Sequence, residues 1–185
     1  KRVAVSSQTH EAINNLLKRV QKKAESIATN PFVVKLSSGT SEKSDQRSLI
    51  GTKVQAFREN ALNCEPNVLG ATVFGLVKER FGEEPYDLLV IDEAGQVSLS
   101  NLLYMSHCAR NILLVGDQNQ LSQPNRAKHP EDSGLSCLEY VMGKEKVVPS
   151  DRGVFLATSW RMPPALTSVV SDLFYQGELQ SCISK

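Results

Sequence analysis

The sequence has few cysteines, no long hydrophobic run and almost no net charge. Its four cysteines lie far apart and form no CxxC pair, at positions 64, 108, 137 and 182. This spacing signals neither a zinc site nor a small disulfide framework, so we expect reduced, mostly packed thiols. No apolar stretch approaches the length that crosses a bilayer, and the first residues lack the core of a signal peptide. We therefore expect no membrane association and a cytoplasmic location, or a nuclear one in a eukaryote.

The formal net charge of +1 argues neither for nor against a nucleic-acid partner. The distribution of charge is more informative, because basic residues concentrate in the first third of the chain and acidic residues cluster around Glu84 and Asp87. A basic flank beside an acidic centre fits a nucleic-acid track next to a magnesium site, although solvated helix faces explain most charge runs of this kind. The length of 185 residues and the hydrophobic fraction of 41% suffice for one globular domain with a substantial core.

Short apolar runs alternate with helical patterns along the chain. The runs typical of strands cover residues 3–5, 32–36, 68–72, 88–91, 112–115 and 154–157. Apolar residues recur at helical spacing from residue 12 to 27, and again within 99–105 and 135–142. This alternation predicts an α/β domain with parallel strands joined by crossover helices. The polar segment 36–50 is expected to form an exposed excursion with local disorder.

Two of the apolar runs end abruptly in polar residues. Residues 88–91 precede the adjacent carboxylates Asp92 and Glu93, and residues 112–115 precede Gly116, Asp117, Gln118 and Gln120. In open α/β sheets ligands bind at the carboxyl ends of the strands, where two acids can hold Mg²⁺ and orient a water molecule. The alternative is that Asp92 and Glu93 only cap the next helix. Because the pattern recurs two dozen residues later, we favour the site of a nucleoside triphosphatase.

These segments resemble the motifs of superfamily 1 helicases, most closely the group that contains the up-frameshift RNA helicase of nonsense-mediated decay and its DNA-acting relatives. VAVSSQTHEAINNLL is similar to motif Ia, VIDEAGQ to motif II, LLVGDQNQLSQP to motif III, and LATSWRMPPALTSVVSDLFYQGELQ to motif IV and the start of the following domain. The resemblance implies a RecA-like three-layer α/β domain with a mainly parallel sheet. Residues 1–160 would form part of the first motor domain, and residues 161–185 would hold motif IV and the start of the second RecA-like domain.

The resemblance also implies a function, which is ATP-dependent movement along single-stranded DNA or RNA. Its cofactors would be ATP and Mg²⁺. Its partners would be single-stranded nucleic acid and the second RecA-like domain of the same chain. Two alternatives stay open, namely a degenerate module that binds a protein or a nucleic acid without hydrolysis, and a nucleotide-dependent switch that does not unwind.

The resemblance assigns catalytic roles to four residues. Asp92 would be the Mg²⁺ ligand and Glu93 the group that aligns and deprotonates the attacking water. Gln120 would sense the γ-phosphate, unless it is only a polar turn residue. Arg161 would bind a phosphate through its planar, permanently charged guanidinium.

Four further residues are expected at the nucleotide, namely Gln96, Gly116, Asp117 and Trp160. The amide of Gln96 could reach back toward the acidic pair or could cap a helix. Trp160 replaces the tyrosine usual in the family and could stack on a base or pack in the core. Pro163 stands where the family usually has histidine, which puts a polar role of that position in doubt.

Nucleic-acid phosphates would contact Ser7, Thr9 and His10 of motif Ia and Thr72 after the following strand, because such enzymes hold single strands largely through backbone amides and hydroxyls. His10 has the alternative of a surface residue at a helix cap. Asn14 replaces an aspartate usual in that helix.

A phosphate-binding loop of the form GxxxxGK[ST] is missing from the sequence. Aligning Lys43 and Ser44 with the end of that motif places Ser37 and Glu42 where both glycines belong, and a carboxylate there would face the phosphates. We therefore expect a fragment whose true start lies upstream, a sheet incomplete at the P-loop strand, and negligible ATP hydrolysis by these residues alone. That strand pairs beside the motif III strand in RecA-like sheets, so residues 112–115 should form an exposed or swapped edge that favours self-association.

Overall fold

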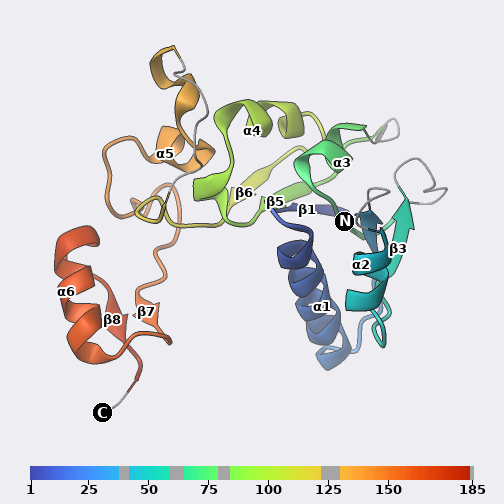
Figure 1. Ribbon diagram of the computed structural model, residues 1–185, viewed down its shortest axis with the longest axis horizontal. Helices are drawn as coiled ribbons and strands as arrows, with labels where there is room; N and C mark the ends of the chain where they lie inside the picture. Colours follow the sequence, from blue (N-terminus) through green and yellow to red (C-terminus); the bar gives the residue numbers. More distant parts are fainter. Residues whose placement is uncertain (38–41, 59–64, 79–83, 122–129, 184–185) are drawn as a thin grey trace.

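A parallel sheet with helices on both faces forms the body of the molecule (Figure 1). The computed structural model describes residues 1–37, 42–58, 65–78, 84–121 and 130–183. The sheet has six strands in the order β3-β2-β4-β1-β5-β6, and each described pairing between neighbours is parallel. The strands are β1 Val3–Ser6, β2 Val33–Ser37, β3 Gln55–Arg58, β4 Val68–Gly70, β5 Leu88–Ile91 and β6 Ile112–Leu114.

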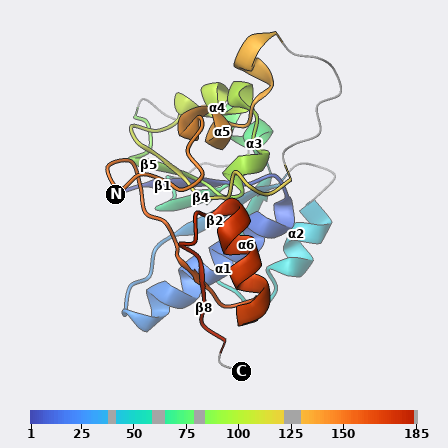
Figure 2. The same cartoon turned by 90° about the vertical axis from the view of Figure 1, so that its left-hand side faces the viewer.

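The helices form the two outer layers of the domain (Figures 1 and 2). One face of the sheet carries α1 His10–Ser26 and α2 Glu42–Ser48. The other face carries α3 Val73–Lys78, α4 Leu99–Ser106 and α5 Cys137–Met142, with the short 3₁₀ helices η1 Ala94–Gln96 and η2 Glu131–Gly134 in the connections. The buried hydrophobic residues fall into two clusters, one of which contains α1 residues and the other residues of α3, α4 and α5. The predicted three-layer RecA-like α/β class is confirmed.

Helix α1 begins and packs where its sequence directs. Thr9 has an extended backbone, and its Oγ1 accepts a hydrogen bond of 3.1 Å from the amide of Ala12, which satisfies one of the free donors of the first turn. The helix then lies directly on β4, because Gly70 has no side chain. A Cβ at Gly70 would lie 2.6 Å from Cδ1 of Leu17 and 2.7 Å from Cγ2 of Ile13. This close approach fixes the amino end of α1 at the carboxyl edge of the sheet.

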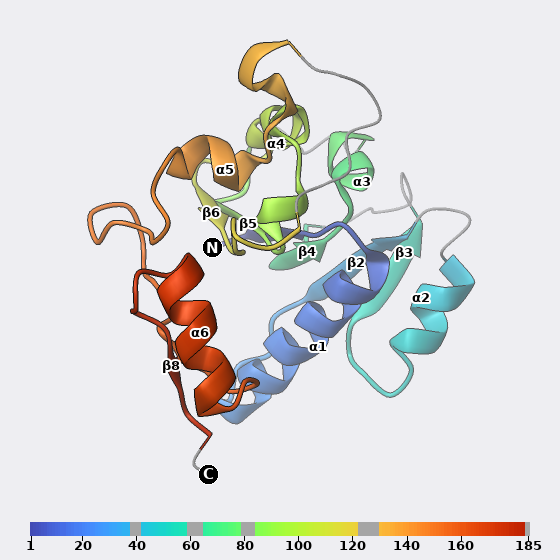
Figure 3. The same ribbon diagram turned by 60° about the vertical axis from the view of Figure 1, so that its left-hand side comes forward.

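A smaller unit follows the sheet at the carboxyl end of the chain. It consists of helix α6 Pro164–Phe174 and a two-stranded parallel sheet of β7 Thr158–Ser159 and β8 Gln180–Ser181. Figure 3 shows this unit beside the β6 edge of the main sheet. No helix within the described ranges is both long enough and apolar enough to span a membrane.

The expectation for residues 36–50 is wrong in its described part. Strand β2 continues through Ser37, α2 covers Glu42–Ser48, and Leu49 is buried in the core. Residues 38–41 lie outside the described residues. The polar composition misled the prediction because one of these polar side chains, Asp45, points inward and anchors α2 to the sheet through Ser37. Strand β3, with its exposed polar ends, was not predicted at all.

The expected strand at residues 154–157 is also absent, and the short strand β7 begins one residue later. In the described structure no strand pairs along residues 154–157, and the one backbone bond to a strand is at their end, where the amide of Gln180 in β8 donates to the carbonyl of Ala157 at 2.7 Å. Val154, Phe155 and Leu156 instead face β6 across a cavity of about 890 Å³. An apolar run alone does not make a strand when the neighbouring strand is missing.

Strand β6 is the edge of the described sheet, as the sequence predicted. It pairs with β5 alone, and Ile112, Leu113 and Val115 are 39%, 48% and 39% exposed. The carbonyl of Asn111 and the amide of Val115 bond to β5. Because alternate residues of a strand direct their backbone groups to opposite sides, the amide and carbonyl of Ile112 face away from β5.

Candidate functional site

The loops that follow β1, β5 and β6 meet at the carboxyl edge of the sheet. The amide of Asp92 donates to the carbonyl of Ser6 at 2.9 Å, and the amide of Ala94 donates to the carbonyl of Val115 at 2.9 Å. The side-chain amide of Gln8 donates to the carbonyl of Gln96. These bonds bring motif Ia, motif II and motif III side by side, which the order of the strands requires and the sequence predicted.

Two glycines allow the motif II and motif III loops to touch through their backbones. A Cβ at Gly116 would lie 2.8 Å from the amide nitrogen of Ala94, and a Cβ at Gly95 would lie 2.7 Å from the carbonyl oxygen of Asp117. Neither contact leaves room for a side chain, because backbone atoms cannot move aside as a flexible side chain can. Gly116, expected at the nucleotide, is therefore the residue that sets the distance between the two loops.

The acidic pair lies at the tip of this arrangement. Asp92 is half-buried, whereas Glu93 is exposed and has a left-handed backbone with a φ of 55°. A left-handed conformation is uncommon for a residue other than glycine, and strained residues of this kind cluster at functional sites. Their different exposure makes the two carboxylates non-equivalent groups. Within the described residues no group of three or more His, Cys, Asp or Glu side chains gathers as a metal site.

Gln96 does not cap the next helix, so that alternative for it is excluded. The cap of α4 is Ser98, whose Oγ accepts a hydrogen bond of 3.3 Å from the amide of Asn101. Gln96 is the last residue of η1, and its backbone amide donates to the carbonyl of Glu93 at 2.9 Å. Its backbone is thus held next to the acidic pair.

The motif Ia loop presents hydroxyl groups at the amino end of α1. Ser6 and Ser7 are 1% and 2% exposed, and neither hydroxyl has a hydrogen-bond partner within the described residues. Thr9 caps α1, and the Oγ1 of Thr72 accepts a bond of 3.4 Å from the amide of Gly75 at the start of α3. A hydroxyl that accepts one bond retains its own proton for a second one. These groups can therefore still donate to a phosphate.

His10 belongs to a buried network that the sequence did not reveal. Its Nδ1 lies 3.0 Å from Nζ of Lys35 and 3.4 Å from Oδ2 of Asp45. Lys35 and Asp45 are 0% and 1% exposed, with 3.5 Å between Nζ and Oδ2. Ser37 donates to Oδ2 of Asp45 at 2.7 Å, and Asn14 donates to Oδ1 at 2.9 Å. The network joins β2, α1 and α2, and it gives Asn14 a defined role as a donor.

The pKa of Asp45 is shifted by opposing effects. Burial alone would raise it, but the hydrogen bonds from Ser37 and Asn14 and the positive charges of Lys35 and His10 together lower the pKa of Asp45 below its usual value. The carboxylate is therefore ionised inside the protein. A lysine within the otherwise apolar run VVKLS was the signal that could have revealed this network, since an unpaired buried lysine is too costly to occur.

Motif III turns toward the carboxyl-terminal unit. Oδ1 of Asp117 accepts a bond of 2.9 Å from the amide of Asn119, and Oδ2 accepts a bond from the hydroxyl of Tyr175. Asn119 also donates to the carbonyl of Phe174 at 3.2 Å. Both carboxylate oxygens of Asp117, expected at the nucleotide, are thus engaged within the protein, while the side chain of Gln120 is exposed.

Arg161 and Trp160 are not joined to the acidic pair. Both are exposed in the turn between β7 and α6, with Trp160 at 79% exposure. The amide of Arg161 donates to Oγ of Ser159 at 3.4 Å, and no ion pair connects its guanidinium to Asp92 or Glu93 in the described part of the chain. The structure therefore brings together the expected residues of motifs Ia, II and III, and it leaves those of motif IV on the carboxyl-terminal unit.

Comparison with known proteins agrees with this geometry. Residues 1–123 match a protein family described as an AAA domain. The chain belongs to this family. It is 26% identical over 180 residues to the DNA replication ATP-dependent helicase/nuclease DNA2 of Xenopus laevis, which covers 96% of the chain. It is 29% identical over 133 residues to the regulator of nonsense transcripts 1 of Dictyostelium discoideum, which covers 71% of the chain.

A third relative is the 5'-3' DNA helicase ZGRF1 of Mus musculus, with 27% identity over 120 residues and 64% of the chain covered. The predicted relationship to superfamily 1 helicases of the up-frameshift-like group is confirmed by the AAA-domain match and by these relatives. The chain spans 17% of the length of the Xenopus protein, 10% of the Dictyostelium protein and 6% of the mouse protein.

Proposed function

We propose that this member of the AAA-domain family is part of an ATP-dependent helicase, in which ATP hydrolysis drives movement along single-stranded DNA or RNA. The observation that supports it most is the contact of the motif II and motif III loops through Gly95 and Gly116 at the carboxyl edge of the sheet, with motif Ia beside them. This edge is where open α/β sheets bind ligands. The names of two relatives, an ATP-dependent helicase/nuclease and a DNA helicase, agree with it.

In this proposal the acidic pair has two separate tasks. The half-buried Asp92 would hold Mg²⁺, a cation that needs only one or two carboxylates because phosphate oxygens and water complete its shell. Such an ion would supply positive charge beside the phosphates. The exposed Glu93 orients the attacking water and takes its proton, and the exposed Gln120 meets the γ-phosphate. Gln96 and Gly116 fix the loops around the nucleotide.

Residues 161–185 belong, in this proposal, to the second RecA-like domain, and residues 1–160 to the first. Arg161 then acts on the nucleotide from the second domain, and Trp160 from the end of the first. Their separation from Asp92 in the present arrangement fits a site that is completed only when that cleft closes.

Nucleic-acid phosphates would lie along the amino end of α1. The partial positive charge of a helix amino terminus attracts anions. Ser7 supports this placement, because a buried hydroxyl without a partner is costly unless a ligand satisfies it. Thr9, His10 and Thr72 would contribute further contacts, although the ring of His10 is also held by Lys35 and Asp45.

The test of the proposal is the variant Glu93→Gln in the full-length protein. We expect ATP hydrolysis to fall by about 10²- to 10⁴-fold, which is the usual contribution of general acid–base catalysis, while ATP binding is retained. The matched control is Glu178→Gln, which changes an exposed glutamate on the carboxyl-terminal unit and should leave turnover unchanged. Equal turnover of wild type and Glu93→Gln would remove Glu93 from the role of water activation.

We also propose that the isolated 185-residue chain self-associates through β6. An edge strand with open backbone groups and exposed apolar side chains is a template for another strand. Replacing Leu113 by lysine puts a charge on that edge, so the variant should remain monomeric under conditions in which the wild type forms dimers or larger species. Light scattering after size-exclusion chromatography measures this, and a wild type that is monomeric up to high concentration would contradict it.

A further inference from the structure

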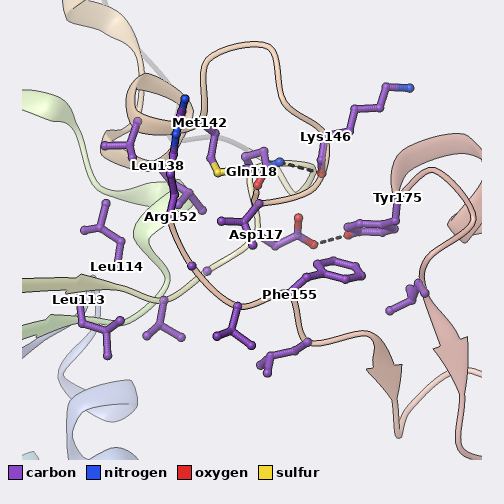
Figure 4. Close-up of a pocket in the computed structure, with 18 of the residues that line it drawn as sticks. Leu113, Leu114, Asp117, Gln118, Leu138, Met142, Lys146, Arg152, Phe155 and Tyr175 are labelled. Atoms are coloured by element: carbon purple, nitrogen blue, oxygen red, sulfur yellow. Dashed lines mark hydrogen bonds between the residues drawn. The ribbon is translucent and has the colours of Figure 1, made fainter. Parts of the chain in front are cut away.

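Tyr175 ties the motif III loop to the end of helix α6. Its hydroxyl donates to Oδ2 of Asp117, and its ring lies 5.8 Å from that of Phe155 at an interplanar angle of 34° (Figure 4). We propose that Tyr175 is a positioning residue that couples the nucleotide-sensing motif III loop to α6, so that a shift of the loop moves the carboxyl-terminal unit. This inference rests on the proposed function and adds to it a residue that was given no role in it.

The bond between Tyr175 and Asp117 is of a strong kind. A phenol that donates to an ionised carboxylate makes a charge-assisted hydrogen bond, about twice as strong as a bond between neutral groups. The pKa of Tyr175 is raised well above its ordinary value by burial, and further by the hydrogen bond and the charge of Asp117. The phenol therefore stays protonated and keeps donating at every physiological pH. The contact with Phe155 limits the positions that the ring can take.

Further bonds attach the same loop and its neighbours to the carboxyl end of α6. Asn119 donates to the carbonyl of Phe174 at 3.2 Å, and Nζ of Lys146 donates to the carbonyl of Leu173 at 3.2 Å. The last carbonyls of a helix lack partners within it and carry partial negative charge. The motif III loop and Lys146 therefore act as the cap of α6.

The segment around Lys146 is itself held by motif III. Nε2 of Gln118 donates to the carbonyl of Lys146 at 2.9 Å (Figure 4). It also donates to the carbonyl of Glu145 at 3.0 Å. Asp117, Gln118 and Asn119 thus all bond to elements that lead into the carboxyl-terminal unit. Gly95 contacts the carbonyl of Asp117 from the other side. A displacement of this loop by a phosphate would consequently reach α6 through direct contacts.

The test is Tyr175→Phe, which keeps the ring and removes the hydroxyl. In the full-length protein we expect kcat for ATP hydrolysis stimulated by single-stranded nucleic acid to fall by about fivefold or more, with the KM for ATP unchanged within about twofold. The loss should stay below about 150-fold, which is the upper value of a hydrogen bond to a charged group expressed as a ratio. The matched control is Tyr140→Phe, because Tyr140 is 53% exposed on α5 and should tolerate the change with no effect on kcat.

Hydrogen exchange of the 185-residue chain gives the second measurement. Tyr175→Phe should speed amide exchange in residues 115–121, and Tyr140→Phe should not. Stimulated kcat equal to that of wild type, or a lowered melting temperature without any change in kcat, would overturn the coupling and leave Tyr175 a structural residue. A wild-type protein that hydrolyses no ATP would overturn the proposed function together with the coupling, whereas an active wild type with an unaffected Tyr175→Phe would overturn the coupling alone.

Discussion

The buried pair of Lys35 and Asp45 makes a strong prediction about stability. Both side chains are almost wholly removed from water, and 3.5 Å separates Nζ from Oδ2. Lys35→Met would leave the buried carboxylate without the lysine cation, and removing one partner of a buried ion pair costs about 3–5 kcal/mol. Ser37 and Asn14 would still donate to Asp45, and His10 would remain 3.4 Å from Oδ2, so we expect the low end of this range. For a chain of this size that loss lowers the melting temperature by about 6–12 °C.

Thermal and urea unfolding at neutral pH, followed by circular dichroism, measure this effect. The matched control is Lys144→Met, since Lys144 is exposed and a surface substitution usually changes the free energy of unfolding by less than about 0.5 kcal/mol. The double variant Lys35→Met with Asp45→Asn removes both charges, and it should be more stable than Lys35→Met alone. A Lys35→Met protein within about 1 kcal/mol of wild type would refute the reasoning, because the carboxylate could not then be buried as described.

Three further predictions follow from the same contacts. Because the pKa of Asp45 is lowered on folding, its contribution to stability is present above the pKa of an unfolded aspartate and is lost as the pH falls through the lowered value. Asp45→Asn should therefore make the free energy of unfolding depend less on pH between neutral and acidic pH. An unchanged slope would contradict this. Gly116→Ala should lower the free energy of unfolding by more than about 1 kcal/mol and reduce ATP binding by the full-length protein, because the new Cβ would lie 2.8 Å from the amide nitrogen of Ala94. Calorimetry measures the first effect, and a melting curve like that of the wild type would show that the two loops are not in contact. The purified 185-residue chain should hydrolyse ATP at a negligible rate, since it carries no GxxxxGK[ST] sequence, and turnover like that of a complete helicase in a phosphate-release assay would disprove it.

Much of the fold could be predicted because local patterns and global packing agree in it. The apolar runs at β1, β5 and β6 and the helical stripe of α1 were found to within a few residues. The failures have definite physical reasons. Residues 154–157 have strand composition but bond to a strand only at Ala157 in the described structure, and α2 is held by a buried polar contact at Asp45 rather than by an apolar stripe. Hydrophobic periodicity reveals neither the missing strand pairing nor the buried polar contact.

The candidate site shows the same division. The meeting of motif II with motif III followed from the rule that parallel strands place their carboxyl ends at one edge, and the structure agrees, since the amide of Ala94 donates to the carbonyl of Val115. The engagement of Asp117 by Tyr175 could not be predicted, because the two residues are 58 positions apart and nothing in the spacing joins them. The roles of Asp92, Glu93 and Arg161 in hydrolysis remain predictions.

The backbone contacts at Gly95 and Gly116 make the loops of motifs II and III move together. With a backbone oxygen or nitrogen filling the space where each missing methyl group would stand, neither loop can slide without pushing the other. A chimera that exchanges one of these loops for that of a distant relative would carry a mismatched surface into this contact. An exchange of either loop between proteins should therefore move Gly95 and Gly116 together with their flanking residues.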